Sequence, residues 1–328
     1  MIRFGILSTA KIAEQHLIPA MQQASNVQLT AIASRTVKKA QSVAARGTLP
    51  LAFGSYEELL DSADVDAVYI PLPTSQHVEW SEKAIKAGKH VLSEKPLALK
   101  ASDINRLIRA RDKAGVVVSE AFMVTYHPQW IKVKELLAKG AIGRLRCISG
   151  SFSYFNTDPK NMRNRPELGG GVLPDIGVYP VVCARFVTGE EPQSVMASVD
   201  FDPQFNTDRY AQVNLQFTGF DMSFYVSTQL ANRQTMVFHG DKGFIELTAP
   251  FNSNLYEGDE VRLHNAAHSE TRVFRYTGVN QYRLQLEAFA KFASSGKGSI
   301  FHLEDSHRNQ KVIDAVYKAG KSGKKVKV

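Results

Sequence analysis

The sequence predicts an α/β protein in which a doubly wound parallel sheet is followed by an α+β part with a large open antiparallel sheet. Up to about residue 120, short apolar runs alternate with helical stretches, and this alternation favours parallel strands joined by helices. From Leu145 onward, long strand-like runs follow one another with turn signals between them, which favours antiparallel hairpins. We therefore expect one domain over residues 1–120 and a second over residues 121–328.

The composition is ordinary for a globular chain of 328 residues, with 44% hydrophobic and 22% charged residues. No apolar run approaches the roughly 20 residues that span a bilayer, and no secretory signal is visible, so we expect a cytoplasmic protein without a membrane partner. Much of the formal net charge of +8 comes from lysines in the last eleven residues, and without a nucleic-acid motif we expect no nucleic-acid partner. Cys147 and Cys183 are far apart and outside metal-ligand spacings, which favours buried reduced thiols, with no disulfide and no metal site.

The first strand, Ile2–Leu7, leads into a turn of small residues and a helix reaching toward Met21. Such a unit offers backbone N–H groups and a positive helix end to a pyrophosphate. The expected cofactor contacts here are Ser8, Thr9, Ala10, Lys11 and Ile12. Fingerprint glycines are absent, and their small replacements permit close approach only if the turn needs no positive φ. A capped helix after a buried strand would look the same.

The second strand, Val27–Ala33, ends at Ser34-Arg35-Thr36 without a carboxylate. Dinucleotide folds that bind NAD place an acidic residue here for the ribose hydroxyl, whereas an arginine accommodates the 2′-phosphate of NADP. The residues therefore favour NADP, bound by Ser34 and Arg35, with NAD as the alternative. An exposed basic helix start explains them equally well.

Alternation continues through the rest of the first domain. Leu51–Phe53 is the third strand, and a capping box at Ser55 opens a short helix. The fourth strand, Asp66–Leu72, is broken by prolines that cannot continue a central ladder. The residues expected to line the cofactor after this strand are Pro71, Leu72, Thr74 and His77. A helix over 101–114 and a strand over 116–119 complete this domain.

Ser93-Glu94-Lys95-Pro96 follows the short strand His90–Leu92. In an open parallel sheet the carboxyl ends of the strands are where ligands bind, so Lys95 is a candidate for chemistry and Glu94 for the cofactor side. A lone Glu-Lys-Pro is more often a solvated charge pair at a strand end.

The second half has a helix from Trp130 to about Lys139 and then strands over 145–155, 193–202, 209–218, 222–230, 234–239 and 243–248. Helices over 282–292 and 303–318 end it. Within it, Gly169–Gly171 mark a helix start that another group approaches closely, and Pro174 sets that start near Leu173. Asp175 and Tyr179 then lie on one helix face, close enough to act on one ligand. A dipole-stabilising carboxylate and a half-buried aromatic would look the same.

Taken together, three segments resemble the glucose–fructose oxidoreductase and inositol dehydrogenase family (Gfo/Idh/MocA): Glu94-Lys95-Pro96, Glu120-Ala121-Phe122-Met123 with His127-Pro128, and the Gly-Gly-Gly segment through Tyr179. The likeness is greatest to dimeric dihydrodiol dehydrogenases and NADP-dependent aldose dehydrogenases. The resemblance implies a Rossmann domain, a cis peptide between Lys95 and Pro96, and a homodimer formed through the open sheet of the second domain.

The resemblance also implies roles for single residues. Lys95 matches the family's catalytic lysine, Tyr179 its acid/base tyrosine and Asp175 its supporting aspartate. The expected contacts to a small sugar or trans-diol substrate are Glu120, Phe122, Arg165, Asp175 and Tyr179. Thr125 stands where many relatives have an arginine. The implied activity is NAD(P)-dependent hydride transfer to or from a hydroxyl-bearing carbon; a glycosidase using transient oxidation and a non-catalytic cofactor sensor are the alternatives.

Overall fold

The computed structural model describes residues 1–255 and 258–328, and the chain forms two compact units. The first unit comprises Met1–Met123 and Asn280–His307, and the second comprises Val124–Val279 and Arg308–Val328. The division after Met123 lies close to the expected boundary at residue 120. The return of Asn280–His307 to the first unit was not expected, and it follows from packing: Phe289 of helix α8 (Gln281–Ser295) lies against Phe4, with ring centroids 5.8 Å apart.

The first unit contains a six-stranded sheet in the order β3-β2-β1-β4-β5-β6, with every neighbouring pair parallel. Its strands are β1 (Ile2–Leu7), β2 (Val27–Ala33), β3 (Leu51–Phe53), β4 (Ala67–Ile70), β5 (His90–Ser93) and β6 (Val118–Glu120). This order confirms the doubly wound prediction. The strand order reverses between β1 and β4, whose carboxyl ends flank the crevice where such sheets bind ligands.

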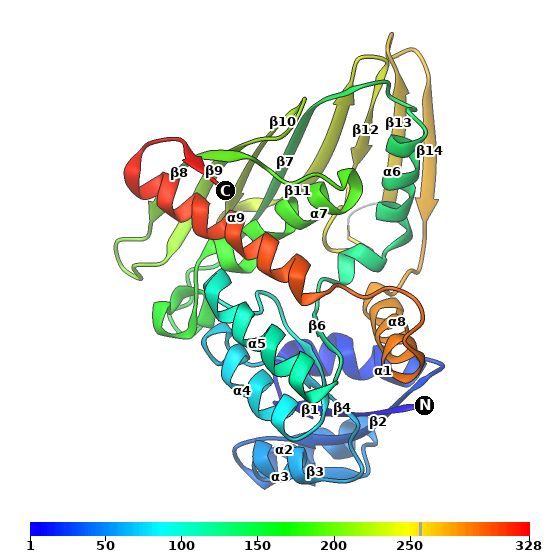
Figure 1. Cartoon of the computed structure of the whole chain (residues 1–328), viewed down its shortest axis with the longest axis vertical. Helices are drawn as coiled ribbons and strands as arrows, with labels where there is room; N and C mark the ends of the chain where they lie inside the picture. The colour runs from blue at the N-terminus through cyan, green and yellow to red at the C-terminus, as the bar shows by residue number, and fades with distance from the viewer. Residues whose placement is uncertain (256–257) are drawn as a thin grey trace. The chain divides into compact units, whose positions relative to one another are not determined.

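Helices cover both faces of this sheet (Figure 1). They are α1 (Ile18–Gln23) after a π-helical turn (Ala13–Leu17), α2 (Val37–Gly47), α3 (Tyr56–Asp61), α4 (Thr74–Lys86), α5 (Ala101–Ala114) and α8 (Gln281–Ser295). One apolar cluster joins α1 and α8 to Phe4 and Ile6 of β1, and a second joins α4 and α5 to Val68 and Ile70 of β4. Alternate residues of the strands therefore pack into two separate hydrophobic cores, as expected of a sheet buried on both sides.

The second unit contains a nine-stranded sheet in the order β14-β13-β12-β11-β7-β10-β9-β8-β15. Its strands are β7 (Leu145–Phe155), β8 (Ser194–Phe201), β9 (Asp208–Gln216), β10 (Asp221–Ser227), β11 (Gln229–Gly240), β12 (Gly243–Leu247), β13 (Asp259–Asn265), β14 (Thr271–Tyr276) and β15 (Val326–Lys327). The hairpins β9–β10 and β11–β12 are as predicted.

The sheet is mixed rather than wholly antiparallel, because β7 and β10 run parallel with Cys147 opposite Asp221. After β10 the chain passes to the other side of β7 and forms β11 there, so β7 separates two strands that are consecutive in sequence. The sequence analysis did not identify β13, β14 and β15. β14 carries three exposed charged or polar residues and no buried one, so it lacks the alternation that marks a half-buried strand.

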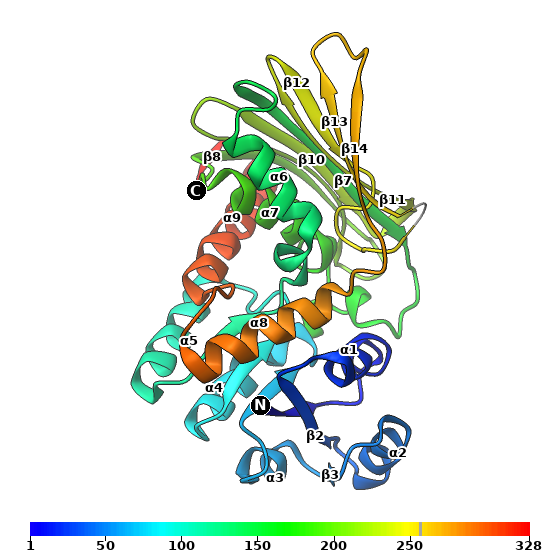
Figure 2. The same cartoon turned by 90° about the vertical axis from the view of Figure 1, so that its right-hand side faces the viewer.

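The remaining helices are α6 (Pro128–Ala138), α7 (Val178–Thr188) and α9 (Leu303–Ser322), with 3₁₀ turns at Met123–Tyr126, Met162–Asn164 and Pro166–Leu168 and a π-helical turn at Leu173–Gly177. Figure 2 shows α6 and α7 on one side of the nine-stranded sheet. On this side Trp130 of α6 packs edge-on against Phe238, with centroids 6.2 Å apart. On the other side, polar residues such as Ser149 and Gln212 are exposed or half-buried. Cys147 of β7 is also exposed, so the expected burial holds for Cys183 and is wrong for Cys147, which lies at a position of the sheet that no helix covers.

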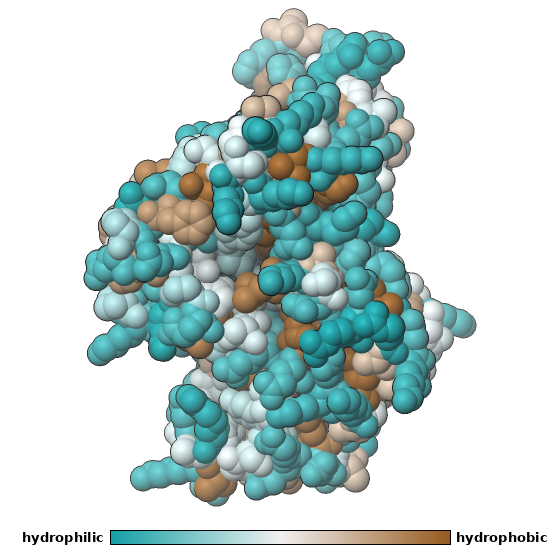
Figure 3. Space-filling model, turned by 60° about the vertical axis from the view of Figure 1, so that its left-hand side comes forward, coloured by the Kyte–Doolittle hydropathy of each residue, from teal (hydrophilic) through white to brown (hydrophobic). Residues whose placement is uncertain are grey.

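The most apolar stretch of the chain is buried, whereas hydrophilic side chains dominate the surface seen in Figure 3. The expectation that no apolar run approaches the length of a membrane span was wrong, because the stretch Pro166–Thr188 is long and apolar enough to cross a membrane. However, 83% of its most apolar window is buried within the protein, as in the core helix of a globular domain. On the side seen in Figure 3, hydrophilic side chains dominate and apolar ones occur in small separate groups.

Candidate active site

The turn after β1 holds Ser8 at φ 146°. This is a backbone conformation that glycine adopts readily and other residues rarely do, so the turn does need a positive φ and the condition set by the sequence analysis fails at this residue. The carbonyl oxygen of Ala10 accepts from the N–H groups of Ala13 and Glu14, which places the helix start at Lys11. Strained backbone at the end of β1, followed by a helix, is the geometry expected of a nucleotide-binding turn.

Tyr56, which begins α3 shortly after β3, is a residue of this region that the sequence analysis did not single out. Its phenol lies near the Ser8 hydroxyl and the charge of Arg35, and burial raises the pKa of Tyr56. Arg35 is exposed, and the buried Ser34 donates its N–H to Phe53 O at 3.2 Å. The ends of β1, β2 and β3 therefore converge. Only the pairing of the strands reveals this, because Tyr56 looks in sequence like the first residue of a capped helix.

Lys95 follows β5, and its peptide bond to Pro96 is cis, as the resemblance implied. The neighbouring Glu94 is only 9% exposed, so it is not part of a solvated charge pair. Its carboxylate accepts a hydrogen bond from the phenol of Tyr69 in β4 and a longer one, 3.3 Å, from the N–H of Lys95. Glu94 thus fixes the backbone of Lys95 to the neighbouring strand.

His77 in α4 is buried beside this loop. Nδ1 lies 2.8 Å from Pro96 O and Nε2 lies 2.7 Å from Leu72 O. Burial lowers the pKa of His77, opposed by the two carbonyl contacts and reinforced by the charge of Lys95. Since both ring nitrogens face backbone carbonyls, His77 connects the loops after β4 and β5 and is poorly placed to exchange protons with a substrate.

Glu120 at the end of β6 is the second carboxyl group near Lys95. It accepts from the N–H of Leu97 at 2.8 Å and from Ser306, and burial raises the pKa of Glu120 to about 7, with a smaller opposing effect from the Lys95 charge. Phe122 is fully buried and packs edge-on against Phe301, with centroids 5.0 Å apart. Both residues have partners within the first unit, and their assignment to the substrate stays a prediction.

In the second unit, the glycine run has the close neighbours that the sequence predicted. A side chain at Gly171, whose φ is 132°, would meet Asp208 Oδ1 at 2.0 Å. Asp208 accepts from the N–H of Leu173 at 2.7 Å and from the phenol of Tyr317 at 2.8 Å, and burial raises the pKa of Asp208. A carboxylate from β9 therefore caps the start of the helical segment at Leu173, where the sequence placed it.

Asp175 lies in the π-helical turn that precedes Tyr179 and α7. Proline at 180 has no N–H to give to the carbonyl of residue 176, and the wider turn accommodates this loss. Asp175 Oδ2 accepts from Tyr154 Oη at 2.6 Å and from Arg163 Nε at 2.7 Å. The charge of Asp175 raises the pKa of Arg163, and burial followed by that same charge raises the pKa of Tyr154.

Arg163 and Tyr154 are therefore site residues that sequence reasoning missed. The arginine that it chose, Arg165, instead pairs with Glu167 through Nε at 2.7 Å, with both side chains about half exposed. The structure thus brings Arg163 to Asp175 and leaves Arg165 in a local ion pair. A substrate role for Arg165 stays a prediction.

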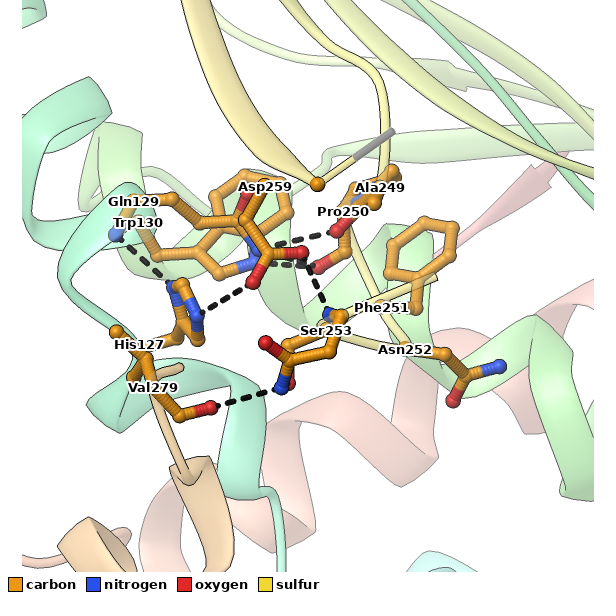
Figure 4. Close-up of polar contacts among 12 residues, drawn as sticks. His127, Gln129, Trp130, Ala249, Pro250, Phe251, Asn252, Ser253, Asp259 and Val279 are labelled. Carbon is orange, nitrogen blue, oxygen red and sulfur yellow. Dashed lines mark hydrogen bonds and ion pairs between the residues drawn. The ribbon is translucent and has the colours of Figure 1, made fainter. Parts of the chain in front are cut away.

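Tyr179 is buried among aromatic rings. Its centroid lies 5.9 Å from that of Phe152 and 5.7 Å from that of Phe251. Phe251 belongs to the segment after β12, and Gln234 Oε1 holds that segment by accepting from the N–H groups of Phe251 and Asn252. Trp130 Nε1 donates to Pro250 O at 2.8 Å, which fixes the preceding residue (Figure 4).

His127 and Asp259 extend this support (Figure 4). His127 Nδ1 accepts from the N–H of Gln129, so Nε2 carries the ring proton of the neutral imidazole, and it lies 3.2 Å from Asp259 Oδ2. Asp259 Oδ1 accepts from the N–H of Asn254. The His-Pro pair noted in the sequence thus anchors the segment that packs on Tyr179. No cluster of three or more His, Cys, Asp or Glu suited to a metal occurs in the described parts of the chain.

The structure describes the expected site as two sets of residues. The first unit brings together the cofactor turn, Arg35, His77, Glu94, Lys95 and Glu120, and the second brings together Asp175, Tyr179, Arg163 and Tyr154.

Comparisons with known proteins match segments in both units of the chain. Residues 2–122 match the model of an oxidoreductase family with an NAD-binding Rossmann fold, and residues 130–246 match the Gfo/Idh/MocA C-terminal domain. An oxidoreductase of Rhizobium meliloti is 41% identical over 98% of each chain. The D-xylose 1-dehydrogenase (NADP(+)) 2 of Haloferax volcanii is 33% identical over 99% of each chain. A solved 3-ketoreductase of Actinomadura kijaniata, in complex with NADP and TDP-benzene, is 30% identical with a TM-score of 0.90 over 97% of each chain.

Proposed function

The chain belongs to the Gfo/Idh/MocA family of oxidoreductases, and from this premise we propose that it transfers a hydride between NADP and a hydroxyl-bearing carbon of a sugar or trans-diol. The observation that carries the proposal is the pair of residue sets: a strained nucleotide turn with Lys95 in the first unit, and a tyrosine with a supported aspartate in the second.

The residues of the first unit fit a phosphorylated dinucleotide. Ser8 supplies the unusual backbone conformation of the turn, and the end of β2 carries Ser34 and Arg35 without a carboxylate. A guanidinium can donate two parallel hydrogen bonds to a phosphate, which suits the 2′-phosphate of NADP. When bound, the cofactor supplies the hydride acceptor or donor at nicotinamide C4. Pro71, Leu72, Thr74 and His77 are the proposed contacts on its other side.

The chain's own residues must move a proton, because a carbinol carbon gives up a hydride only as its hydroxyl loses a proton. We assign this proton to Tyr179. A phenol has an ordinary pKa of about 10, and a nearby cation favours the phenolate. Arg163 is one such cation within the second unit, since its charge and that of a Tyr179 phenolate interact. We assign Lys95 as the other.

Asp175 supports this arrangement through Arg163. Its Oδ2 is engaged by Arg163 and Tyr154, and it lies one helical turn before Tyr179. The role proposed for Asp175 is therefore to hold the guanidinium in place. This role adds to the predicted one, in which Asp175 holds Lys95 or the substrate.

The test is a panel of aldoses and trans-diols incubated with NADP, with net NADPH formation as the readout. Tyr179→Phe should lower kcat by about 10² to 10⁴ with little change in NADP affinity, the range that general acid–base groups contribute. Tyr225→Phe, on the far face of the nine-stranded sheet, is the matched control and should leave kcat unchanged. Cleavage of a glycoside without net NADPH would indicate the glycosidase alternative, and tight NADP binding without turnover would indicate a sensor. If Tyr179→Phe keeps the wild-type kcat, a group other than Tyr179 must accept the proton.

A homodimer through the nine-stranded sheet and a cytoplasmic location complete the proposal. The sheet face turned away from α6 and α7 carries exposed or half-buried Ser149, Tyr225, Val237 and Arg262, and an open face of this extent suits a second copy of the chain. Light scattering should give a mass of twice the 36.4 kDa chain at micromolar concentration. A mass of one chain would contradict the dimer.

A further inference from the structure

Arg163 is held in place by the glycine run that starts the catalytic helix. The N–H of Gly171 donates to Arg163 O at 2.9 Å, and a side chain at Gly170 would lie 2.5 Å from that same oxygen. Two glycines are thus needed for the backbone of Arg163 to lie against the segment that carries Asp175. The 3₁₀ turn Met162–Asn164 is itself capped by Asn161, whose side chain accepts from the N–H of Arg163. Hydrogen bonds to both the N–H and the carbonyl oxygen of Arg163 therefore fix the position of its backbone, and with it the position of its Cβ atom.

Only one of the guanidinium nitrogens of Arg163, Nε, donates a hydrogen bond within the described residues. Nε donates to Asp175 Oδ2 at 2.7 Å, and 40% of the side chain remains exposed. Within residues 1–255 and 258–328, neither Nη group donates a hydrogen bond to the protein. An arginine has five N–H donors in a planar fork, so four donors on two adjacent nitrogens are available to a ligand.

The chemistry of the pair indicates what kind of ligand suits those donors. Asp175 already balances the positive charge of Arg163, so the pair as a whole offers directed donors with little net charge. A second carboxylate would compete with Asp175 for the same cation, whereas two neighbouring hydroxyl oxygens can accept from the two Nη groups without adding charge. Arg163 Nε lies 2.7 Å from Asp175 Oδ2, and Asp175 lies one helical turn before Tyr179, so these donors are near the group assigned to the reacting hydroxyl.

We infer that Arg163 determines substrate specificity by binding two neighbouring oxygens of the substrate, so that the enzyme selects a neutral vicinal diol over a simple alcohol. The inference rests on the proposed function and deepens it: Tyr179 takes the proton of the reacting hydroxyl, and Arg163 orients the adjacent oxygen. A substrate lacking the second hydroxyl leaves donors of Arg163 unpaired, and sites built to hydrogen-bond a hydroxyl discriminate strongly against analogues that lack it.

The experiment compares trans-1,2-cyclohexanediol with cyclohexanol and D-glucose with 2-deoxy-D-glucose, measuring kcat/KM with NADP for each pair. Wild type should prefer the vicinal diol of each pair by at least about tenfold, well inside the range open to a hydrogen-bonding site. Arg163→Met should reduce this preference to below about twofold and leave NADP affinity unchanged. Arg163→Lys keeps a charge beside Asp175 without the planar fork, so it should fold like wild type and show an intermediate preference. The matched control is Arg146→Met, at an exposed arginine of β7 in the same unit, which should keep the wild-type preference.

Two outcomes overturn the inference. One is an equal loss of activity on the diol and on its deoxy analogue in Arg163→Met, which would make Arg163 only a support for Asp175. The other is a wild-type protein that shows no preference for the vicinal diol over its analogue in either pair. If the wild type oxidises none of the four compounds, the proposed function fails, and calorimetric titration of the NADP-loaded protein with the cyclohexanediol decides the inference separately. Binding that Arg163→Met abolishes and Arg146→Met preserves supports it, whereas equal binding by all three proteins, or no binding by wild type, contradicts it.

Discussion

The imidazole of His77 lies between two backbone carbonyls, with Nδ1 2.8 Å from Pro96 O and Nε2 2.7 Å from Leu72 O. Helix α4 thereby holds the loop after β4 and the loop after β5 in a fixed relation. Lys95 directly precedes Pro96, so the position of its backbone depends on a side chain eighteen residues earlier in the sequence.

Replacing His77 by alanine should loosen both loops. Loss of a fully buried side chain with two polar contacts should lower the free energy of unfolding by roughly 2–4 kcal/mol, and kcat should fall because the Lys95 backbone loses its anchor. Chemical denaturation and steady-state kinetics measure the two effects. His239→Ala, on an exposed side chain of β11, is the control and should change neither. A His77→Ala variant with full stability would show that the two carbonyl contacts contribute little.

The protein should be more stable with glycine at position 8 than with the native Ser8. A non-glycine residue held at a φ of 146° stores strain, on the order of 1–3 kcal/mol for such conformations. Ser8→Gly should release part of it and raise the free energy of unfolding by about 1 kcal/mol, although the hydroxyl contact to Tyr56 is lost. Ser8→Ala loses the same hydroxyl while keeping the strain, so it should be less stable than wild type. Urea unfolding of the three proteins checks the order, and equal stability of the two variants would contradict the strain.

Arg35 should decide between the two nicotinamide cofactors. Arg35→Asp replaces the proposed phosphate ligand by a carboxylate that repels the 2′-phosphate and can accept from a ribose hydroxyl, so the preference should change from NADP to NAD. Fluorescence titration with both cofactors at physiological salt measures it. Lys38→Asp, an equal change of charge three residues later in α2, should keep the NADP preference. If wild type already binds NAD as tightly as NADP, Arg35 does not have this role.

Glu120 should make stability depend on pH. Burial raises the pKa of Glu120 from 4.5 to about 7 in the folded protein, so the folded state binds more protons than the unfolded state between these values. The stabilisation from the protonated group is complete below about pH 4.5 and is lost as the pH rises through 7, a change of roughly 3 kcal/mol at 1.4 kcal/mol per pKa unit.

Glu120→Gln should remove that slope and be the more stable protein at pH 8. Melting temperatures of wild type and variant from pH 4.5 to pH 8 test this, with Glu57→Gln at an exposed site as the control. Parallel pH curves for wild type and Glu120→Gln would show that Glu120 does not titrate in this range.

Local signals in the sequence were sufficient for many elements. The strands Ile2–Leu7 and Val27–Ala33 and the helix Ala101–Ala114 have the predicted bounds, because each is an apolar pattern closed by residues that stop it. Pro174 fixed the helical start at Leu173 for the same reason, since proline fits only a first turn. The order of the motifs along the chain was enough to indicate the family.

Contacts between distant residues required the tertiary structure. The sequence analysis selected Arg165 and missed Arg163, because the close approach of the Arg163 backbone to Gly170 and Gly171, which lets Arg163 meet Asp175, is a tertiary contact. The parallel pairing of β7 with β10 and the return of Asn280–His307 to the first unit depend on which apolar faces meet. A strand or helix shows its own buried face in its sequence, but its partner is chosen by the packing of the whole unit.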